Sequence, residues 1–201
     1  MALFSKNKKE QNTLKKLNKK VKKTLPAARY NHSVGVAFTA ASMAMRYGAD
    51  INCALIAGIL HDCAKMHSGM ELLAMCDNYG ITPSDAQRTN PDLLHGIIGS
   101  CIAKDKFDIK DQDILNAIAY HTTGRAGMSL LEKIIFIADY IEPSRKIIPG
   151  LDKARELAFT DLDECIISVA EGTIRHLREK KADIDPLTQE TLDFYKNNIS
   201  D

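Results

Sequence analysis

The sequence predicts an all-α fold, and two observations carry that prediction. The chain of 201 residues contains only four valines, and it has no convincing alternating strand of five or more residues. Its apolar stretches are instead bounded by Ser, Asp, Pro and Gly, which commonly begin or end helices. A chain of this length, 45% hydrophobic and 26% charged, can bury the core of one domain.

The first half of the chain contains residues with a defined role at helix ends. Ser, Asp and Asn can bind the free N–H groups of the first turn, Pro fits that turn, and Gly tolerates the left-handed conformation that ends many helices. Such residues are Pro26 in the first turn of a helix containing residues 30–47, Gly48 at its end, Asp50 before a helix to about 60, Ser68 before one ending short of Gly80, and Asn90–Pro91 before one through Ala103.

The second half is expected to be helical as well. The expected elements are helices at about 111–121, 129–142 and 161–181, a break at Asp185–Pro186, and a short last helix. Pro143 and Pro149–Gly150 mark the expected boundary between a catalytic part and the C-terminal helices. These helices, from about residue 150, would cover the catalytic part. The expected organisation is a lysine-rich N-terminal helix or tail over 1–25 and one domain over 26–201.

The N-terminal segment differs from the rest in charge. Residues 1–25 hold nine lysines and one acid, a net charge of +8, so the other 176 residues carry −7 within the total of +1. Leu14, Leu17, Val21 and Leu25 form one apolar stripe at helical spacing. We expect a solvated helix laid on the domain; a weak contact with nucleic acid or a membrane surface stays open, although no aromatic residues form a stacking platform.

The cysteines and apolar runs bear on location. Five cysteines, an odd number without a C-x-x-C pair, argue against a disulfide framework or a thiolate zinc site. The apolar runs fall short of the ~20 residues that span a bilayer, and the lysine-rich start has no apolar signal segment. We therefore expect a cytoplasmic protein without a membrane span.

The stretch ILHDCAKMH contains the first candidate functional residues. Its adjacent pair, His61–Asp62, follows an apolar helix. Neighbouring helical side chains point about 100° apart, so both can serve one site only near a helix end. Taken alone, a core histidine beside a capping aspartate is the commoner explanation.

Four further residues change that interpretation. His32, His95, His121 and Asp139 lie in apolar surroundings on successive expected helices. A lone ionised carboxylate buried there would cost several kcal/mol unless paired or metal-bound. The economical account is that all six residues converge. Nitrogen and oxygen ligands favour iron, manganese, zinc or magnesium. Six ligands suit two metals bridged by a carboxylate, an arrangement that activates water for phosphoryl displacement.

The order H…HD…H…H…D resembles the HD-domain phosphohydrolase superfamily. The segments HDCAK, YHTTGR and ADYIEPSR resemble the symmetrical diadenosine tetraphosphate hydrolases, the YqeK family, and the resemblance covers about residues 26–185. It implies an HD-domain helical bundle, bound iron, and cleavage of diadenosine tetraphosphate into two ADP. It also implies that His32, His61, Asp62 and Asp139 hold the principal metal, with His95 and His121 completing a second site and Asp62 as the bridge.

The same resemblance suggests substrate-binding roles that agree with the chemistry of nearby side chains. If the helix continues, Lys65 lies on the face of His61 and Asp62 and can reach a phosphate. Hydroxyls, a glycine and an arginine make the loop after His121 a plausible phosphate cradle. The expected catalytic residues are Asp62, Lys65, His95, His121 and Arg125, and the expected substrate contacts add Arg29, Thr122, Thr123, Gly124, Asp139 and Arg145.

Two other functions remain open at this point. The superfamily motif also fits a deoxynucleotide phosphatase, a guanosine tetraphosphate hydrolase or a cyclic-nucleotide phosphodiesterase. A non-enzymatic RNA- or ribosome-binding module could use the lysine-rich helix instead. The sequence leaves the native metal, the residues that contact the base, and homodimer formation undetermined. His67 and His176 lie in polar segments and are expected to be solvated.

Overall fold

The computed structural model describes residues 14–198, and within that range it contains helices and no strand. The predicted all-α class is therefore confirmed. After a helix over residues 14–24, the elements are α2 (Ala27–Tyr47), α3 (Ile51–Leu60), α4 (Gly69–Tyr79), α5 (Asp85–Thr89), the 3₁₀ helix η1 (Pro91–Leu94), α6 (His95–Phe107), α7 (Gln112–Ala119), α8 (Leu130–Ile141), α9 (Leu151–Leu157), α10 (Leu162–Glu179) and α11 (Pro186–Asn198).

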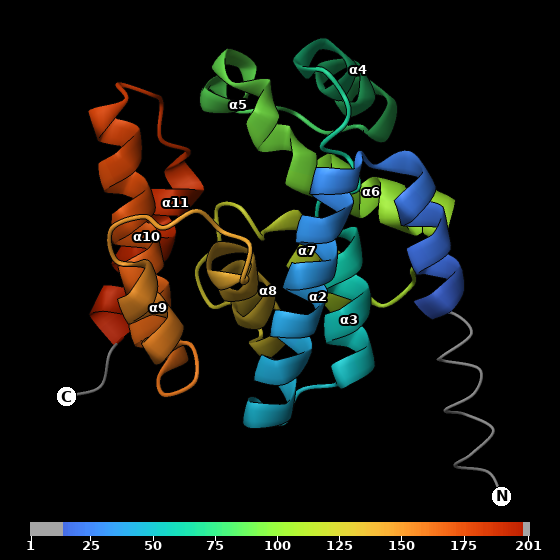
Figure 1. The fold of residues 1–201 in the computed structure, drawn as a ribbon. Helices are drawn as coiled ribbons and strands as arrows, with labels where there is room; N and C mark the ends of the chain where they lie inside the picture. The colour runs from blue at the N-terminus through green and yellow to red at the C-terminus, as the bar shows by residue number, and fades with distance from the viewer. Residues whose placement is uncertain (1–13, 199–201) are drawn as a thin grey trace, which may run out of the picture.

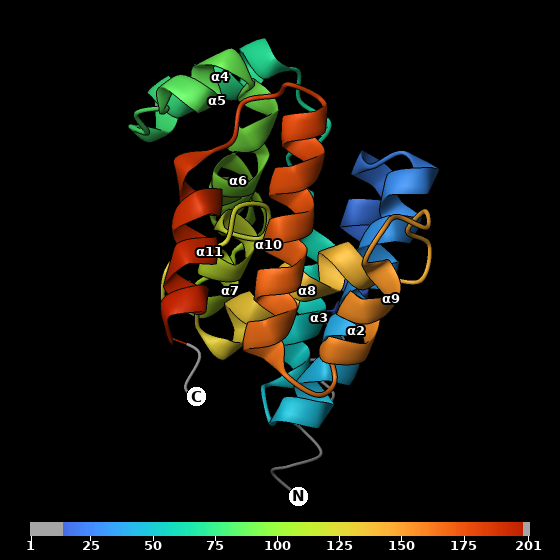
Figure 2. The ribbon, with the colours of Figure 1, turned by 90° about the vertical axis from the view of Figure 1, so that its left-hand side faces the viewer.

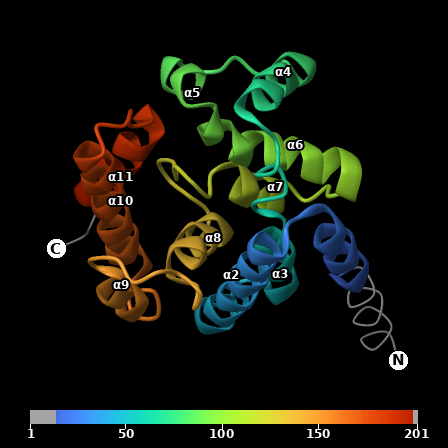
Figure 3. The ribbon, with the colours of Figure 1, turned by 45° about the horizontal axis from the view of Figure 1, so that its top comes forward.

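The helices form a central bundle with two flanks. Helices α2 and α3 lie side by side next to α7 and α8 (Figures 1 and 3). The helix over 14–24 lies on one flank, and α9, α10 and α11 lie on the other. Helices α10 and α11 pack against each other, as Figure 2 shows, and α4 and α5 cover one end of the bundle. Helices α9 and α10 thus pack on α8, and the C-terminal cover expected from about residue 150 stays a prediction.

Several predicted helix ends form as expected. The Asp50 side chain accepts a bond from the Cys53 N–H, and Ser68 and Glu71 form a reciprocal capping box at the start of α4. Gly48 ends α2 in the left-handed conformation, with a φ of 77°. Local side-chain chemistry therefore sets where the elements that carry the site begin and end.

Three local expectations differ from the structure. Pro26 occupies the N-cap of α2, one position before the first turn. The helix expected from Asn90 begins as the 3₁₀ helix η1 and becomes α-helical only at His95, and the Asn90 side chain makes no capping bond. The short helices α5 and α9 were not predicted, because five and seven residues leave little periodicity to detect.

The main hydrophobic cluster extends beyond the predicted domain boundary at residue 26. It contains most of α8 and also three residues of the N-terminal stripe, Leu17, Val21 and Leu25, which are at most 6% exposed. The lysines of this segment within the described range are exposed, as expected for a helix laid on the domain. The part of the lysine-rich prediction that concerns residues 1–13 lies outside the described residues.

Two further expectations concern cysteines and membranes. All five cysteines are free. Within residues 14–198, no helix combines the length and the apolar character that crossing a bilayer requires.

Candidate metal centre

Five separate elements bring the six predicted ligands to one place. They are His32 on α2, the His61–Asp62 pair after α3, His95 at the start of α6, His121 after α7, and Asp139 on α8. The four imidazoles follow one another edge to face, with ring centroids 5.3, 4.9 and 4.9 Å apart along His32, His61, His121 and His95. The convergence expected from the sequence is present.

The end of α3 explains how adjacent residues face the same point. The helix stops at Leu60, and the chain continues in turns through residue 66. The Cys63 N–H binds the Leu60 carbonyl and the Lys65 N–H binds the Asp62 carbonyl. His61 and Asp62 are both buried, with 0% and 3% of their surface exposed. The pair lies at a helix end, as predicted, and Lys65 follows in a turn.

The Asp62 carboxylate lies between two pairs of imidazoles. Its Oδ2 atom is 3.5 Å from the Nε2 atom of His61 and 3.9 Å from that of His32. Its Oδ1 atom is 3.4 Å from Nε2 of His95 and 3.8 Å from that of His121. One oxygen therefore faces each half of the cluster, which is the disposition that a bridging carboxylate requires.

The Nδ1 atoms of the four histidines determine which ring nitrogen faces the cluster. Every Nδ1 atom lies beside an oxygen acceptor, so Nε2 is the ring nitrogen of each histidine that faces the cluster and would bind a metal. These acceptors are the Gly58 carbonyl for His61 at 2.7 Å, the Ile118 carbonyl for His121 at 2.7 Å, the Asp92 carbonyl for His95, and the Glu142 carboxylate for His32 at 3.0 Å.

A divalent metal fits this donor set. Two groups of three residues have ligand atoms within 4.8 Å of one another: His32 with His61 and Asp139, and His61 with Asp62 and His121. The Nε2 atom of His61 is fully buried and makes no hydrogen bond to any described residue. A buried polar atom without a partner is costly, and a metal ion would satisfy it.

The charge states also suit metal binding. Burial would raise the pKa of Asp62, but the facing imidazoles, His61 foremost, hold that pKa far below its usual range. Desolvation likewise opposes ionisation of Asp139, but the contact with His32 together with the charges of His61, Arg145 and His121 lowers its pKa. Burial lowers the pKa of His95 to about 3, and it also lowers that of His121. The site offers ionised carboxylates and neutral imidazoles at these positions.

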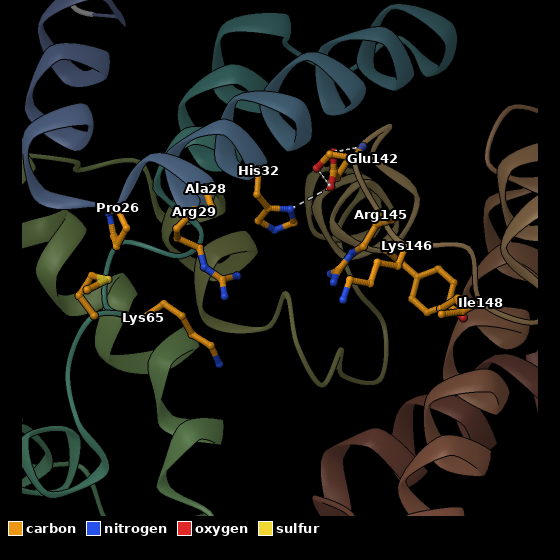
Figure 4. A pocket seen from close by; sticks show the side chains of 12 residues that line it. Pro26, Ala28, Arg29, His32, Lys65, Glu142, Arg145, Lys146 and Ile148 are labelled. Atoms are coloured by element: carbon orange, nitrogen blue, oxygen red, sulfur yellow. Dashed lines mark hydrogen bonds and ion pairs between the residues drawn. The ribbon is translucent and has the colours of Figure 1, made fainter.

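A cleft of about 730 Å³ opens beside the cluster and is lined by four cations (Figure 4). Arg29 and Lys65 point into it from one side, and Arg145 and Lys146 from the other. The Arg29 Nη1 atom is 2.7 Å from Asp62 Oδ2, and the Arg145 Nη2 atom is 2.8 Å from Asp139 Oδ1. The Lys65 Nζ atom is 3.3 Å from His95 Nδ1. A cleft of this charge suits a polyanion.

The two threonines of the loop after His121 have different contacts. The Thr122 hydroxyl is 3.2 Å from Nε2 of both His95 and His121, so it faces the cluster. Thr123 is buried, and its carbonyl accepts a bond from Thr191 of α11.

The glycine and arginine of this loop have contacts outside the cluster. Gly124 has a φ of 66°, and a Cβ there would be 2.7 Å from a Thr191 atom, so close packing on α11 accounts for the glycine. The Arg125 guanidinium makes two bonds to Glu132, at 2.6 and 2.9 Å. Of the expected cradle, Thr122 alone contacts a residue of the cluster.

Two residues of the site were not assigned by sequence reasoning. Lys146 lines the cleft beside Arg145. Glu142 is 1% exposed, and its carboxylate binds His32 and also accepts bonds from the N–H and hydroxyl of Ser144 at 2.7 and 2.6 Å. A Cβ on Gly35 would be 2.5 Å from Glu142 Oε2, so the glycine makes room for the carboxylate. The segment ADYIEPSR contains Glu142, but nothing in the sequence marks it as buried.

Comparison with known families and proteins agrees with the geometry. The HD domain family matches residues 29–144, which contain all six clustered residues. A protein of Bacillus subtilis described as "Bis(5'-nucleosyl)-tetraphosphatase, symmetrical" is 42% identical over 168 residues, 84% of this chain and 89% of that protein. A protein of Staphylococcus aureus with the same description is 37% identical over 190 residues, 94% of this chain and 96% of that protein.

A solved structure shares the fold. It is a Clostridium acetobutylicum protein described as a predicted HD superfamily hydrolase involved in NAD metabolism. The TM-score is 0.88 at 40% sequence identity, and the match covers 91% of this chain and 96% of that one. The similarity therefore extends over nearly the whole chain.

Proposed function

We propose that this chain, which belongs to the HD domain family and within it to the symmetrical bis(5'-nucleosyl)-tetraphosphatases, hydrolyses diadenosine tetraphosphate to two molecules of ADP. The reaction is a metal-dependent hydrolysis of a phosphoanhydride bond. The observation that carries the proposal is the juxtaposition of the cluster of four histidines and two aspartates with a cleft lined by four cations. The first suits a divalent metal and the second a polyphosphate. Five free cysteines fit a reducing cytoplasm, where we place the enzyme.

The donor set supports an assignment of ligands. We assign His32, His61, Asp62 and Asp139 to a principal metal ion. His95 and His121 would complete a second site, and Asp62, whose two oxygens face the two halves of the cluster, would be shared by both. The absence of thiolates favours iron, manganese, zinc or magnesium, and the family resemblance favours iron. Divalent ions held in pairs supply Lewis acidity and lower the pKa of water for attack on phosphorus.

The side chains of the cleft would hold the substrate. Lys65 would neutralise a phosphate next to His95, and the Thr122 hydroxyl would donate to the same group. Arg29 and Arg145 extend the positive surface on either side, and Lys146 continues it outward. Four cations match the charge of a tetraphosphate in a domain that is otherwise acidic. Arg125 is bound to Glu132 and would act through the shape of its loop.

Symmetrical cleavage follows from holding one ADP half. If metals held by these ligands bound its terminal phosphate and Lys65 bound its neighbour, the attacked phosphorus would lie at the end of that half. The other half then leaves as ADP. Asymmetric cleavage would need attack one phosphorus away, roughly 3 Å, whereas a 1 Å misplacement alone can cost ~10²-fold in rate.

Separation of products by anion-exchange chromatography tests the proposal. We expect ADP alone from diadenosine tetraphosphate, with activity lost after chelation and restored by added metal. Equal amounts of AMP and ATP would contradict the symmetrical cut. A substrate panel separates the related reactions: release of phosphate from a deoxynucleotide or of pyrophosphate from guanosine tetraphosphate, without turnover of diadenosine tetraphosphate, would support a different HD-domain activity.

A weak contact with nucleic acid is a separate proposal. The six lysines of residues 14–24 are exposed, whereas Leu17 and Val21 are buried beneath them. Such a surface would give RNA affinity that falls steeply with salt. The affinity should fall when these lysines are changed to glutamine, and an affinity that persists would show that another surface binds.

A further inference from the structure

A second cavity lies next to the cationic cleft. Its volume is about 330 Å³, and it is enclosed by the segment after α8 and the second half of α10. Tyr140 and Ile148 line both this cavity and the cleft. The two spaces are therefore neighbours with a common wall, on the side of the cleft where Arg145 and Lys146 project (Figure 4).

The lining of this cavity has the character of a site for a flat, uncharged ring. Tyr140 contributes an aromatic ring, Ile148 an apolar side chain that is 40% exposed, and Arg175 a guanidinium that can lie over a ring. Gly172 lets the Tyr140 hydroxyl pack closely on α10, because a Cβ there would be 3.0 Å from that hydroxyl. The volume falls within the range of small-molecule sites.

The positions of the cations connect this cavity to the metal centre. The Arg145 guanidinium is 2.8 Å from Asp139, Lys146 follows, and Ile148 borders the cavity two residues later. A polyphosphate that leaves the centre along Arg145 and Lys146 would therefore end at the cavity. Arg29 and Lys65 lie on the opposite side of the cleft.

We propose that this cavity binds the nucleoside of the departing ADP half, with Tyr140 and Arg175 contacting its base. The inference rests on the proposed function, since the substrate has two identical nucleosides and the held half accounts for only one. The cavity then makes the enzyme prefer a substrate that carries a nucleoside at both ends of its four phosphates.

Two substrates isolate this contribution. Diadenosine tetraphosphate and adenosine 5'-tetraphosphate have the same four phosphates, but the second compound has one nucleoside. Since stacking of a base is worth about fivefold or more in affinity, we expect kcat/KM to be at least about fivefold higher for the dinucleotide. The measured quantity is the ratio of the two kcat/KM values, determined for each variant.

Three variants change the cavity, and one serves as a control. Gly172→Leu adds a side chain to the cavity wall that presses on the Tyr140 hydroxyl, Arg175→Ala removes the guanidinium, and Ile148→Ala removes part of the common wall. Arg178→Ala, an exposed arginine of the same helix that does not line this cavity, is the matched control. Melting curves show whether each variant is folded. Arg175 and Ile148 are exposed, so their variants keep the test valid if Gly172→Leu does not fold.

We expect the ratio to fall severalfold in the three variants and to stay at the wild-type value in the control. An unchanged ratio in folded variants, including an equal loss on both substrates, would overturn the inference and leave the proposed function standing. A wild-type ratio near one would do the same. Absence of turnover on both substrates by the metal-loaded wild type would instead overturn the proposed function, and this inference with it.

Discussion

Glu142 offers a sharp test of how the metal centre is held. Its buried carboxylate accepts from the Nδ1 atom of His32 at 3.0 Å, which turns the Nε2 atom of that ring toward the cluster, 2.9 Å from Oδ1 of Asp139. Burial would raise the pKa of Glu142, but two bonds from Ser144 lower it, so the group is ionised. Glu142→Gln replaces one acceptor oxygen by a donor and cannot satisfy His32 and Ser144 together.

The size of the effect follows from the role of such partners. Removing the hydrogen-bond partner of a metal-binding histidine typically weakens metal affinity 10–100-fold, or about 1.4–2.8 kcal/mol. Gly35→Ala should give a similar loss without changing the carboxylate, because the new Cβ would be 2.5 Å from Glu142 Oε2 and would displace it. Both changes act on one contact, so the double variant should be no weaker than the weaker single variant.

Competition with a metal-binding dye measures the affinity of the folded, metal-free protein without any substrate. Glu156→Gln, on the exposed side of α9, makes the same chemical change away from the site and should leave the affinity unchanged. Wild-type affinity in both Glu142→Gln and Gly35→Ala would refute the reasoning. Full additivity in the double variant would show that the two residues act independently.

Three further predictions concern the ligands and the N-terminal helix. Asp62→Ala should abolish turnover, whereas Lys65→Ala should lower kcat ~10²–10³-fold; equal, mild losses would contradict a bridging Asp62. Deleting residues 1–25 should lower the melting temperature, because three buried apolar side chains worth about 1.5–3 kcal/mol each are lost; an unchanged melting temperature would contradict this. Burial opposes protonation of His61, but the neighbouring carboxylates, Asp62 foremost, raise the pKa of this histidine. The amount of metal that stays bound after dialysis should therefore decrease as the pH falls through that pKa. A constant metal content from pH 8 to 5 would contradict this prediction.

The six clustered residues were predictable because their chemistry conflicts with their surroundings. A histidine or aspartate in an apolar helix needs a partner, and six such residues on successive helices need a common one. The position of His61–Asp62 at a helix end was also predictable, since adjacent side chains converge only there. Such conflicts are visible in the sequence before any distance is known.

The contacts of the surrounding residues were harder to predict from the sequence. Glu142 reads as an ordinary charged residue before a proline, and it is buried only because α2 presents Gly35 to it. Gly124 fits either a phosphate cradle or close packing, and only its contact with Thr191, 67 positions later, decides for packing. Arg125 was expected to contact a substrate phosphate, and in the structure its guanidinium pairs with the Glu132 carboxylate. Each outcome depends on a pairing between elements that local sequence does not determine.

Charge balance links the metal centre to the cleft. Arg29 and Arg145 each contact a carboxylate of the cluster, Asp62 and Asp139, so these cations now neutralise the groups that would hold metal. A divalent ion at those oxygens would weaken the hold of the carboxylates on both guanidinium groups, because cations around one carboxylate compete for its charge. The arginines would then be available to phosphate. The residues after position 25 carry a net charge of −7, which repels a polyphosphate at long range. Metal binding would therefore strengthen substrate binding in two ways. It would add positive charge at the centre, and it would free an arginine on each side of the cleft.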